Sequence, residues 1–191
     1  GGLDLVLIGP NDPEAMLRHT EECLFRKIPF VADPSQQLAW MEGDSIKKLI
    51  DGAHILITNE YESALIEQKT GWTSEEISER VDIRVTTLGS NGCKVEARGQ
   101  ETISVSVPPE ELKADPTGVG DAFRAGFLSG LAWGVSLERA AQVGSLLATY
   151  VIETVGTQEY DIAQEKFLKR FSTTYGETAA AEVAVHLKCL R

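Results

Sequence analysis

Short apolar runs alternate with amphipathic helical stretches through the first half of the chain, and this alternation restricts the fold more than any other feature. The apolar runs at 3–8, 28–32 and 54–58 are nearly continuous, as in strands that are buried on both faces of a sheet. The connections between them are short and carry helical patterns, at 13–26, 44–51, 60–69 and 73–81. The pattern predicts an α/β fold with three α/β/α layers around a mainly parallel sheet.

Capping residues support these helical segments and others further along the chain. A polar side chain just before a helical stretch can accept hydrogen bonds from the first free amides of the helix. A Glu or Gln three residues later completes a capping box. Gly52 and other glycines mark helix ends. The expected caps are Asp12 before Pro13, Asp44, Thr73 with Glu76, Ser136, and Asp161 with Gln164.

The pattern changes after residue 82. Runs at 83–88, 93–98 and 102–107 are separated by turns rich in glycine, which predicts an antiparallel meander at one edge of the sheet. Everything beyond the turn before Asp121 reads as helix, at 120–133, from Ser136 to near Gly156, from 161 onward, and at 177–188. No linker or repeat interrupts the chain, so we expect a single domain over residues 1–191.

Charge and composition exclude several classes of function. The net charge is −11, from 18 Lys and Arg against 29 Asp and Glu. This balance argues against wide contact with nucleic acid or an anionic membrane. No apolar run approaches the roughly 20 residues of a membrane span, and no signal peptide is visible. The three widely spaced cysteines do not suggest a disulfide framework, which fits the expected cytoplasmic location. The histidines lack metal-ligand spacing, and no CxxC pair occurs among Cys23, Cys93 and Cys189.

The segment from Asp115 to Asp121 carries the clearest chemical signal. Two glycines, Gly118 and Gly120, flank Val119 directly before an amphipathic helix. The first amides of such a helix have no partner within the helix, and they coincide with the positive end of its dipole. They therefore predict an anion site that could stabilise charge on a phosphoryl group. Small residues repeat along one face of the helix and would let another element approach closely, at Ala122, Gly126 and Gly130.

Asp121 lies in the first turn of the same helix. A carboxylate beside an anion site can accept the proton of an attacking hydroxyl. The helix dipole favours its charged form, which makes it a weak base, but phosphoryl transfer depends mostly on positioning. The competing interpretation is that Asp121 only caps the helix and that the glycines only permit a tight turn.

This segment resembles the D-T-x-G-A-G-D signature of the ribokinase-like, or PfkB-type, kinase family. Here Pro116 replaces the usual threonine and Val119 replaces the usual alanine, and the longer form through Phe127 is most similar to bacterial adenosine kinases. The resemblance implies that Asp121 is the catalytic base. It also implies that the anion hole is formed by Gly118, Val119 and Gly120, and that a monovalent cation such as K⁺ is held by Asp115 and Thr117.

Two further motifs match the family. Asn59 and Glu62 fit its N-x-x-E motif, which implies that they organise Mg²⁺ through water; the alternative is a helix cap. Thr87, Gly89 and Gly92 fit a T-x-G-x-x-G turn beside the ATP phosphates and ribose. The alternative there is a hairpin turn that needs glycine only for its backbone conformation.

Three weaker assignments complete the expected site. Ser145 and Gly156 stand in the helix and following turn that flank the adenine in relatives, although most of that helix reads as core. Asp33 follows the C-terminal end of a strand, where open α/β sheets place ligands, and relatives have a similar element near the substrate. A simple turn explains Asp33 equally well.

The resemblance implies an ATP-dependent kinase that transfers the γ-phosphoryl group of MgATP to a hydroxyl of a nucleoside, with adenosine favoured. Alternatives are a sugar kinase such as ribokinase or fructokinase, and an inactive nucleotide-binding module. A dinucleotide-dependent oxidoreductase is disfavoured, because its G-x-G-x-x-G should follow the first strand.

The resemblance covers only the later part of the family's chain. We therefore expect the N-terminal strands, the lid and most substrate contacts to be missing. The fragment alone should then be nearly inactive, with an unprotected sheet edge at 3–8. The parent enzyme is expected to be a homodimer.

Overall fold

The computed structural model describes residues 2–187 of the chain, and these residues form two compact units. The first unit contains the residues up to Gly89 together with Lys94–Ile103. The second contains Ser90–Cys93 and the residues from Ser104 onward. The single domain expected over residues 1–191 stays a prediction. Among residues 2–187, every helix is too short or too polar to cross a bilayer.

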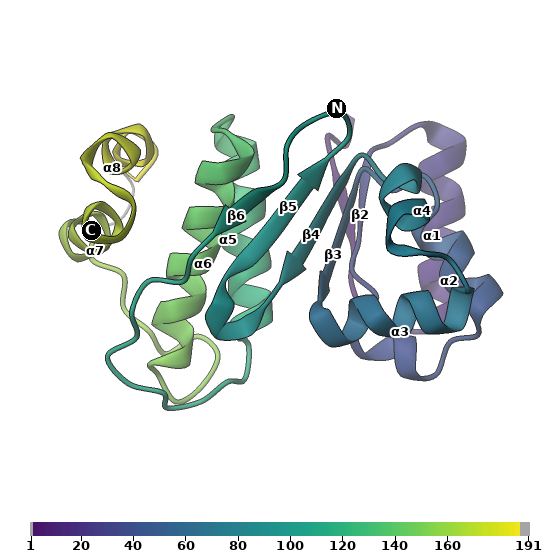
Figure 1. The fold of residues 1–191 in the computed structure, drawn as a ribbon, viewed down its shortest axis with the longest axis horizontal. Coiled ribbons are helices and arrows are strands. Elements are labelled where there is room, and N and C mark those ends of the chain that lie inside the picture. The colour runs from purple at the N-terminus through teal and green to yellow at the C-terminus, as the bar shows by residue number, and fades with distance from the viewer. Residues whose placement is uncertain (1, 188–191) are drawn as a thin grey trace. The chain divides into compact units, whose positions relative to one another are not determined.

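Six strands form one sheet, and they follow one another in chain order across it (Figure 1). The first four are parallel, with Val31 opposite Ile55 and Asn59 opposite Thr87. The last two form an antiparallel edge, so the predicted α/β fold with a mainly parallel sheet and an edge meander is confirmed. The strands are β1 (Val6–Ile8), β2 (Phe30–Ala32), β3 (Ile55–Asn59), β4 (Ile83–Thr87), β5 (Cys93–Ala97) and β6 (Ile103–Val105).

Helices connect the parallel strands of the first unit. Alternate strand residues such as Phe30, Ala32 and Leu56 point toward these helices and share one buried cluster with Ile46 and Ile66. This alternation follows from the two-residue period of a strand. The connecting elements are α1 (Pro13–Arg26), the 3₁₀ helix η1 (Ser35–Ala39), α2 (Gly43–Ile50), α3 (Glu60–Thr70) and α4 (Ser74–Arg80).

Most of the expected caps are present. Asp12 accepts from the Ala15 amide at 3.0 Å, Ser136 accepts from the Arg139 amide at 3.2 Å, and Thr73 with Glu76 forms the predicted capping box. Two of the expected caps, those at Asp44 and Asp161, are wrong, because packing decides where their helices begin.

The Asp44 cap fails because α2 begins at Gly43 with Glu42 at the N-cap position, which places Asp44 inside the first turn. The backbone there lies so close to α3 that a Cβ on Gly43 would be 2.1 Å from the Lys69 carbonyl oxygen. The Asp161 cap fails because the helix begins only at Gln164, while Ile162 packs against a hydrophobic cluster instead.

The second unit is mainly helical. Its core is a cluster of apolar side chains centred on Leu146, Phe167, Phe171 and Val183. Two predicted ends differ: the helix from Ser136 stops at Ile152 rather than near Gly156, and the last one stops at Ala184, while Lys188 lies outside the described residues. The helices are α5 (Val119–Trp133), α6 (Leu137–Ile152), α7 (Gln164–Tyr175) and α8 (Glu177–Ala184).

Helices α5 and α6 approach each other closely through glycines. A Cβ on Gly126 would lie 2.7 Å from the Gly144 Cα, and a Cβ on Gly130 would lie 2.6 Å from the Ala140 Cα. A Cβ on Gly144 would in turn meet the Phe123 carbonyl oxygen at 2.7 Å. Because these neighbours are mostly backbone, they cannot move aside. The small residues expected along this helix face therefore allow the close contact that was predicted for them.

A half-buried ion pair fastens the segment that leads into the Asp115–Asp121 loop. Arg170 Nη1 donates to Glu153 Oε2 at 2.7 Å, and Arg170 Nη2 donates to the Pro109 carbonyl oxygen at 2.6 Å. Glu153 Oε1 also accepts from the Glu111 amide at 2.7 Å. Burial raises the pKa of Glu153, but its hydrogen bonds from Arg170 and the Glu111 amide outweigh this and lower it overall. The pair ties the segment from Pro109 to the C-terminal end of α6.

The close contact at Gly126 predicts that an alanine there destabilises the protein, although helix propensity alone would predict the opposite. Alanine is the better helix former by about 1 kcal/mol, so Gly126→Ala would stabilise an isolated helix. In the folded protein, the new methyl group must push against the α6 backbone, and we expect a net loss of about 1–3 kcal/mol. Denaturant unfolding measures the difference, with the exposed Ser129→Ala on the same helix as the control. A more stable Gly126→Ala variant would contradict the contact.

The Glu153–Arg170 pair predicts a loss of stability that depends on pH. We expect Glu153→Gln to lower the free energy of unfolding by about 1–3 kcal/mol, because the bonds to a charged group weaken. Since the pKa of Glu153 is lowered by folding, its contribution is present above the ordinary glutamate value near 4.3 and is lost as the pH falls below it.

The deficit of Glu153→Gln should therefore be full above about pH 5 and should shrink in more acidic solution. Urea unfolding at several pH values measures it, with Glu101→Gln in the exposed turn before β6 as the control. A deficit that is the same at all pH values would show that the charge of Glu153 is not what stabilises the segment.

Candidate functional site

The N-terminus of α5 presents free backbone amides to solvent. Gly118 caps the helix with a φ of 81°, where a side chain would be strained, and a Cβ there would meet Thr157 Cγ2 at 2.9 Å. The Val119 amide donates to the Pro116 carbonyl oxygen at 3.3 Å. Within residues 2–187, the amides of Gly120 and Asp121 have no recorded acceptor, as expected for the first turn of a helix. This end of the helix can therefore bind an anion.

The Asp121 carboxylate points away from the packed interior, with 87% of its side chain exposed. Its Oδ1 lies 3.5 Å from Nη1 of Arg124, whose own side chain is only 13% exposed. The same guanidinium lies beside Gly120, where an added Cβ would be 2.6 Å from Nη1. Because Gly120 has no side chain, the Arg124 guanidinium can lie at the N-terminus of the helix, next to the Asp121 carboxylate and the first backbone amides.

Sequence reasoning missed Arg124. The signal that could have found it is the three-residue spacing from Asp121, which places the two side chains on the same face of the helix. Asp121 is part of the family motif, whereas Arg124 lies three residues beyond the last residue of that motif.

Asp115 joins two loops next to the start of α5. Its Oδ1 accepts from the Thr117 amide at 2.9 Å, and its Oδ2 accepts from the Gly156 amide at 3.5 Å. Interactions with Thr117, first through its hydroxyl and then through its amide, lower the pKa of Asp115. The structure thus brings Asp115, Thr117 and Gly156 together, and both carboxylate oxygens hold backbone. This arrangement shapes the loop directly before the N-terminus of α5.

The first unit collects its predicted residues at the carboxyl ends of parallel strands. Asp33 follows β2, Asn59 ends β3 and Thr87 ends β4. Asn59 and Thr87 are opposite each other in the register of their strands, and the Asp33 amide donates to the Ile8 carbonyl oxygen at 3.0 Å. This is the edge at which open α/β sheets place their ligands.

Asn59 and Glu62 form a reciprocal capping box at the start of α3. Asn59 Oδ1 accepts from the Glu62 amide and Glu62 Oε2 accepts from the Asn59 amide, both at 2.8 Å. The helix-cap alternative is therefore present in the structure. The box occupies one carboxylate oxygen of Glu62, so Oε1 lies outside it.

The glycines of the turn after β4 have a clear conformational role. Gly89 has a φ of 57° and Gly92 a φ of 88°. A Cβ on Gly92 would lie 1.9 Å from the Val105 carbonyl oxygen, so the backbone of β6 excludes any side chain there. The turn alternative thus accounts for both glycines, and nucleotide binding by Thr87, Gly89 and Gly92 stays a prediction.

Ser145 is buried in the second unit rather than displayed at its surface. It is 3% exposed, and it contacts the Cys93 thiol and the Tyr175 hydroxyl. Burial raises the pKa of Cys93 to about 11, although the hydrogen bond with Ser145 opposes that shift. Cys23 and Cys93 are free, buried thiols, and Cys189 lies outside the described residues. A nucleotide contact of Ser145 stays a prediction, against a burial that favours the core interpretation.

Two hollows of about 390 and 310 Å³ lie in the first unit, next to α4 and β5. They share Ser74 and Glu96, and none of the predicted site residues lines either of them. The predicted site residues described above lie instead at helix and strand ends.

Comparisons with known proteins agree with these features. The model of the pfkB family of carbohydrate kinases matches residues 3–164. The nucleoside kinase of Methanocaldococcus jannaschii is 28% identical over 167 residues, which is 87% of this chain and 55% of that protein.

Solved structures of kinases are also similar to this chain. The nucleoside kinase of Burkholderia thailandensis in complex with inosine is 34% identical, with a TM-score of 0.86 over 91% of this chain and 58% of its own. The same kinase in complex with ADP-inosine also has a TM-score of 0.86. The chain thus spans about half the length of the relatives it matches. Because the family model covers most of its residues, the chain belongs to the pfkB family of carbohydrate kinases.

Proposed function

We propose that this chain forms the ATP-binding and catalytic side of a kinase that phosphorylates a hydroxyl of a nucleoside. The observation that carries the proposal is the exposed carboxylate of Asp121 in the first helical turn, beside the unpaired amides of α5. A structurally similar kinase was solved in complex with ADP-inosine and in complex with inosine, which supports a nucleotide donor and a nucleoside acceptor. Adenosine remains our first choice of acceptor, and inosine and sugars are the comparisons to make.

In the proposed reaction, Asp121 takes the proton of the acceptor hydroxyl. The hydroxyl oxygen then bonds to the γ-phosphorus of ATP while the bond from that phosphorus to the bridging oxygen breaks, and ADP leaves with the electron pair. The amides of Gly118 and Gly120, with that of Asp121, would face the charge on the transferred group. The Val119 amide donates to the Pro116 carbonyl oxygen at 3.3 Å and would have to leave it to take part. Arg124 places a positive charge beside the Asp121 carboxylate, with its Nη1 3.5 Å from Asp121 Oδ1.

Magnesium would neutralise phosphate charge in this reaction, and Asn59 and Glu62 would hold it through water. Their oxygen donors suit a hard ion that keeps most of its waters, and Glu62 Oε1 lies outside the capping box. Among residues 2–187, no group of three or more His, Cys, Asp or Glu side chains is arranged to bind a metal directly. A monovalent cation at Asp115 and Thr117 is a weaker proposal, because both Asp115 oxygens already hold amides.

Three further proposals concern the protein as a whole. Because the chain spans about half of its relatives, we propose that these residues alone bind nucleotide but transfer phosphate very slowly. Acceptor contact by Asp33, a homodimeric parent enzyme and a cytoplasmic location also stay proposals. Nucleotide affinity measured on this chain by calorimetry separates a catalytic half from a chain that has lost nucleotide binding.

The role of Asp121 predicts a large and selective loss of turnover. Asp121→Asn keeps the shape of the side chain but removes the base, so phosphate transfer by the whole encoded protein should fall by at least about 100-fold. Affinity for ATP should change little, since the helix amides are kept. Asp161→Asn, another exposed aspartate of the second unit, is the matched control. Near-normal turnover of Asp121→Asn would rule out the base role.

A further inference from the structure

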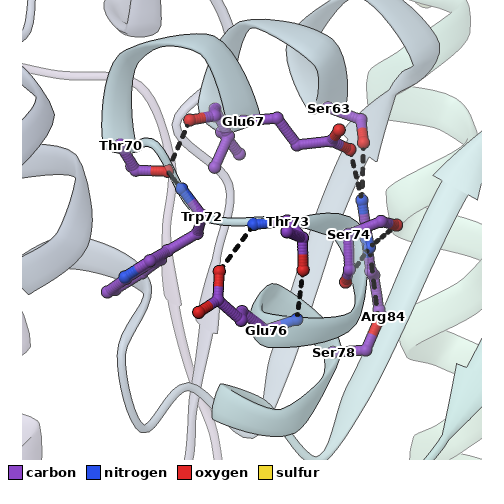
Figure 2. A network of polar contacts seen from close by, with 10 residues as sticks. Ser63, Glu67, Thr70, Trp72, Thr73, Ser74, Glu76, Ser78 and Arg84 are labelled. Carbon is purple, nitrogen blue, oxygen red and sulfur yellow. Dashed lines mark hydrogen bonds and ion pairs between the residues drawn. The ribbon is translucent and has the colours of Figure 1, made fainter.

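A buried arginine on β4 links three elements of the first unit, as Figure 2 shows. Arg84 is 3% exposed. Its Nη2 donates to Ser63 Oγ at 2.6 Å and lies 3.6 Å from Glu67 Oε1, both on α3. Its Nη1 donates to Ser74 Oγ at 2.8 Å, to the Ser74 carbonyl oxygen at 2.9 Å and to Ser78 Oγ at 3.2 Å, all at α4.

The two ends of the guanidinium therefore have different partners. Nη2 serves α3 and Nη1 serves α4, while Nε has no hydrogen-bond partner among the described residues. A buried charge depends strongly on the hydrogen-bond and ion-pair partners that it keeps. The planar, rigid shape of the group also transmits a fixed direction to each helix. Arg84 thus fixes α3 and α4 against β4 through separate sets of bonds.

The α3 partner lies directly beside the predicted phosphate-side residues. Ser63 follows Glu62 in sequence, and Glu67 is one helical turn further along the same face. Asn59 is both the last residue of β3 and the cap of α3, so no linker lies between the strand and the helix. Contacts along the side of α3 therefore set its rotation, and with it the direction of Glu62 Oε1.

We propose that Arg84, acting through Ser63, is a positioning residue that orients the Asn59–Glu62 pair for the metal–nucleotide complex. The proposal rests on the proposed function, since it assigns a use to this pair. Arg84 touches neither residue of the pair in the structure; it acts on the helix that carries them. Arg84 lies on β4, three residues before Thr87 at the end of that strand.

The chain offers a matched pair of variants. Ser63→Ala removes the hydroxyl that Arg84 contacts on α3, and Ser78→Ala removes one that it contacts on α4. Each variant removes one hydroxyl oxygen that accepts a hydrogen bond from the same guanidinium. If Arg84 had a purely structural role, the two variants should have similar effects on the Asn59–Glu62 pair. Ser63→Thr retains a hydroxyl and is the rescue variant.

The first measurement is amide hydrogen exchange in the 191-residue chain, which needs no nucleotide. Ser63→Ala should speed exchange at Asn59 and Glu62, whose amides are bonded within the capping box, and Ser78→Ala should leave them unchanged. Ser63→Thr should restore the slow exchange. Equal exchange in Ser63→Ala and Ser78→Ala would overturn the positioning role, whatever the chain binds.

The second measurement is ATP binding by the same chain as a function of Mg²⁺ concentration. Ser63→Ala should raise the Mg²⁺ concentration for half-maximal binding about 10-fold, with Ser78→Ala and Ser63→Thr close to the unchanged chain. If the unchanged chain binds ATP but all variants respond alike, the positioning role is wrong and the proposed function stands. If the unchanged chain shows no Mg²⁺-dependent ATP binding, the proposed function fails and this inference fails with it.

Discussion

The close contact between α5 and α6 is the constraint on which the proposed catalytic end of the chain depends. Gly126 and Gly144 let the two backbones touch, and this fixes the axis along which the α5 amides point. Helix amides in a first turn are useful to a ligand only when the helix cannot rotate or slide. The Glu153–Arg170 pair and the Asp115–Gly156 hydrogen bond then hold the loop that enters the helix. The position of Asp121 would thus depend on glycine packing between α5 and α6, at residues that do not themselves contact a substrate.

The first unit uses a different device for the same purpose. Its candidate residues lie at strand ends, where the register of β3 and β4 places Asn59 opposite Thr87. The capping box of α3 then ties the Glu62 carboxylate to the strand end. A cap and a metal-organising role are compatible, since the box uses only one oxygen of the carboxylate. Arg84 also connects α3 to the next helix, α4, through hydrogen bonds to Ser63 and Ser74.

Much of the fold could be predicted from the sequence because its signals are local. The parallel strands appear as continuous apolar runs, and caps such as Asp12 and Thr73 act on amides three residues away. Contacts between distant residues were harder to predict. Asp115 meets Gly156 across 41 positions, and Arg84 meets Ser63 across 21, without any periodic pattern. The Asp44 and Asp161 caps failed because packing, rather than a side-chain acceptor, decides where those helices begin.

The central claim is that the first turn of α5 holds the γ-phosphate of ATP beside Asp121. The most direct test compares amide chemical shifts of the chain with MgADP and with MgATP, because the difference isolates the γ-phosphate. The account predicts that the difference is largest at Gly118, Val119, Gly120 and Asp121. A difference centred elsewhere, with these four amides unchanged, would contradict it.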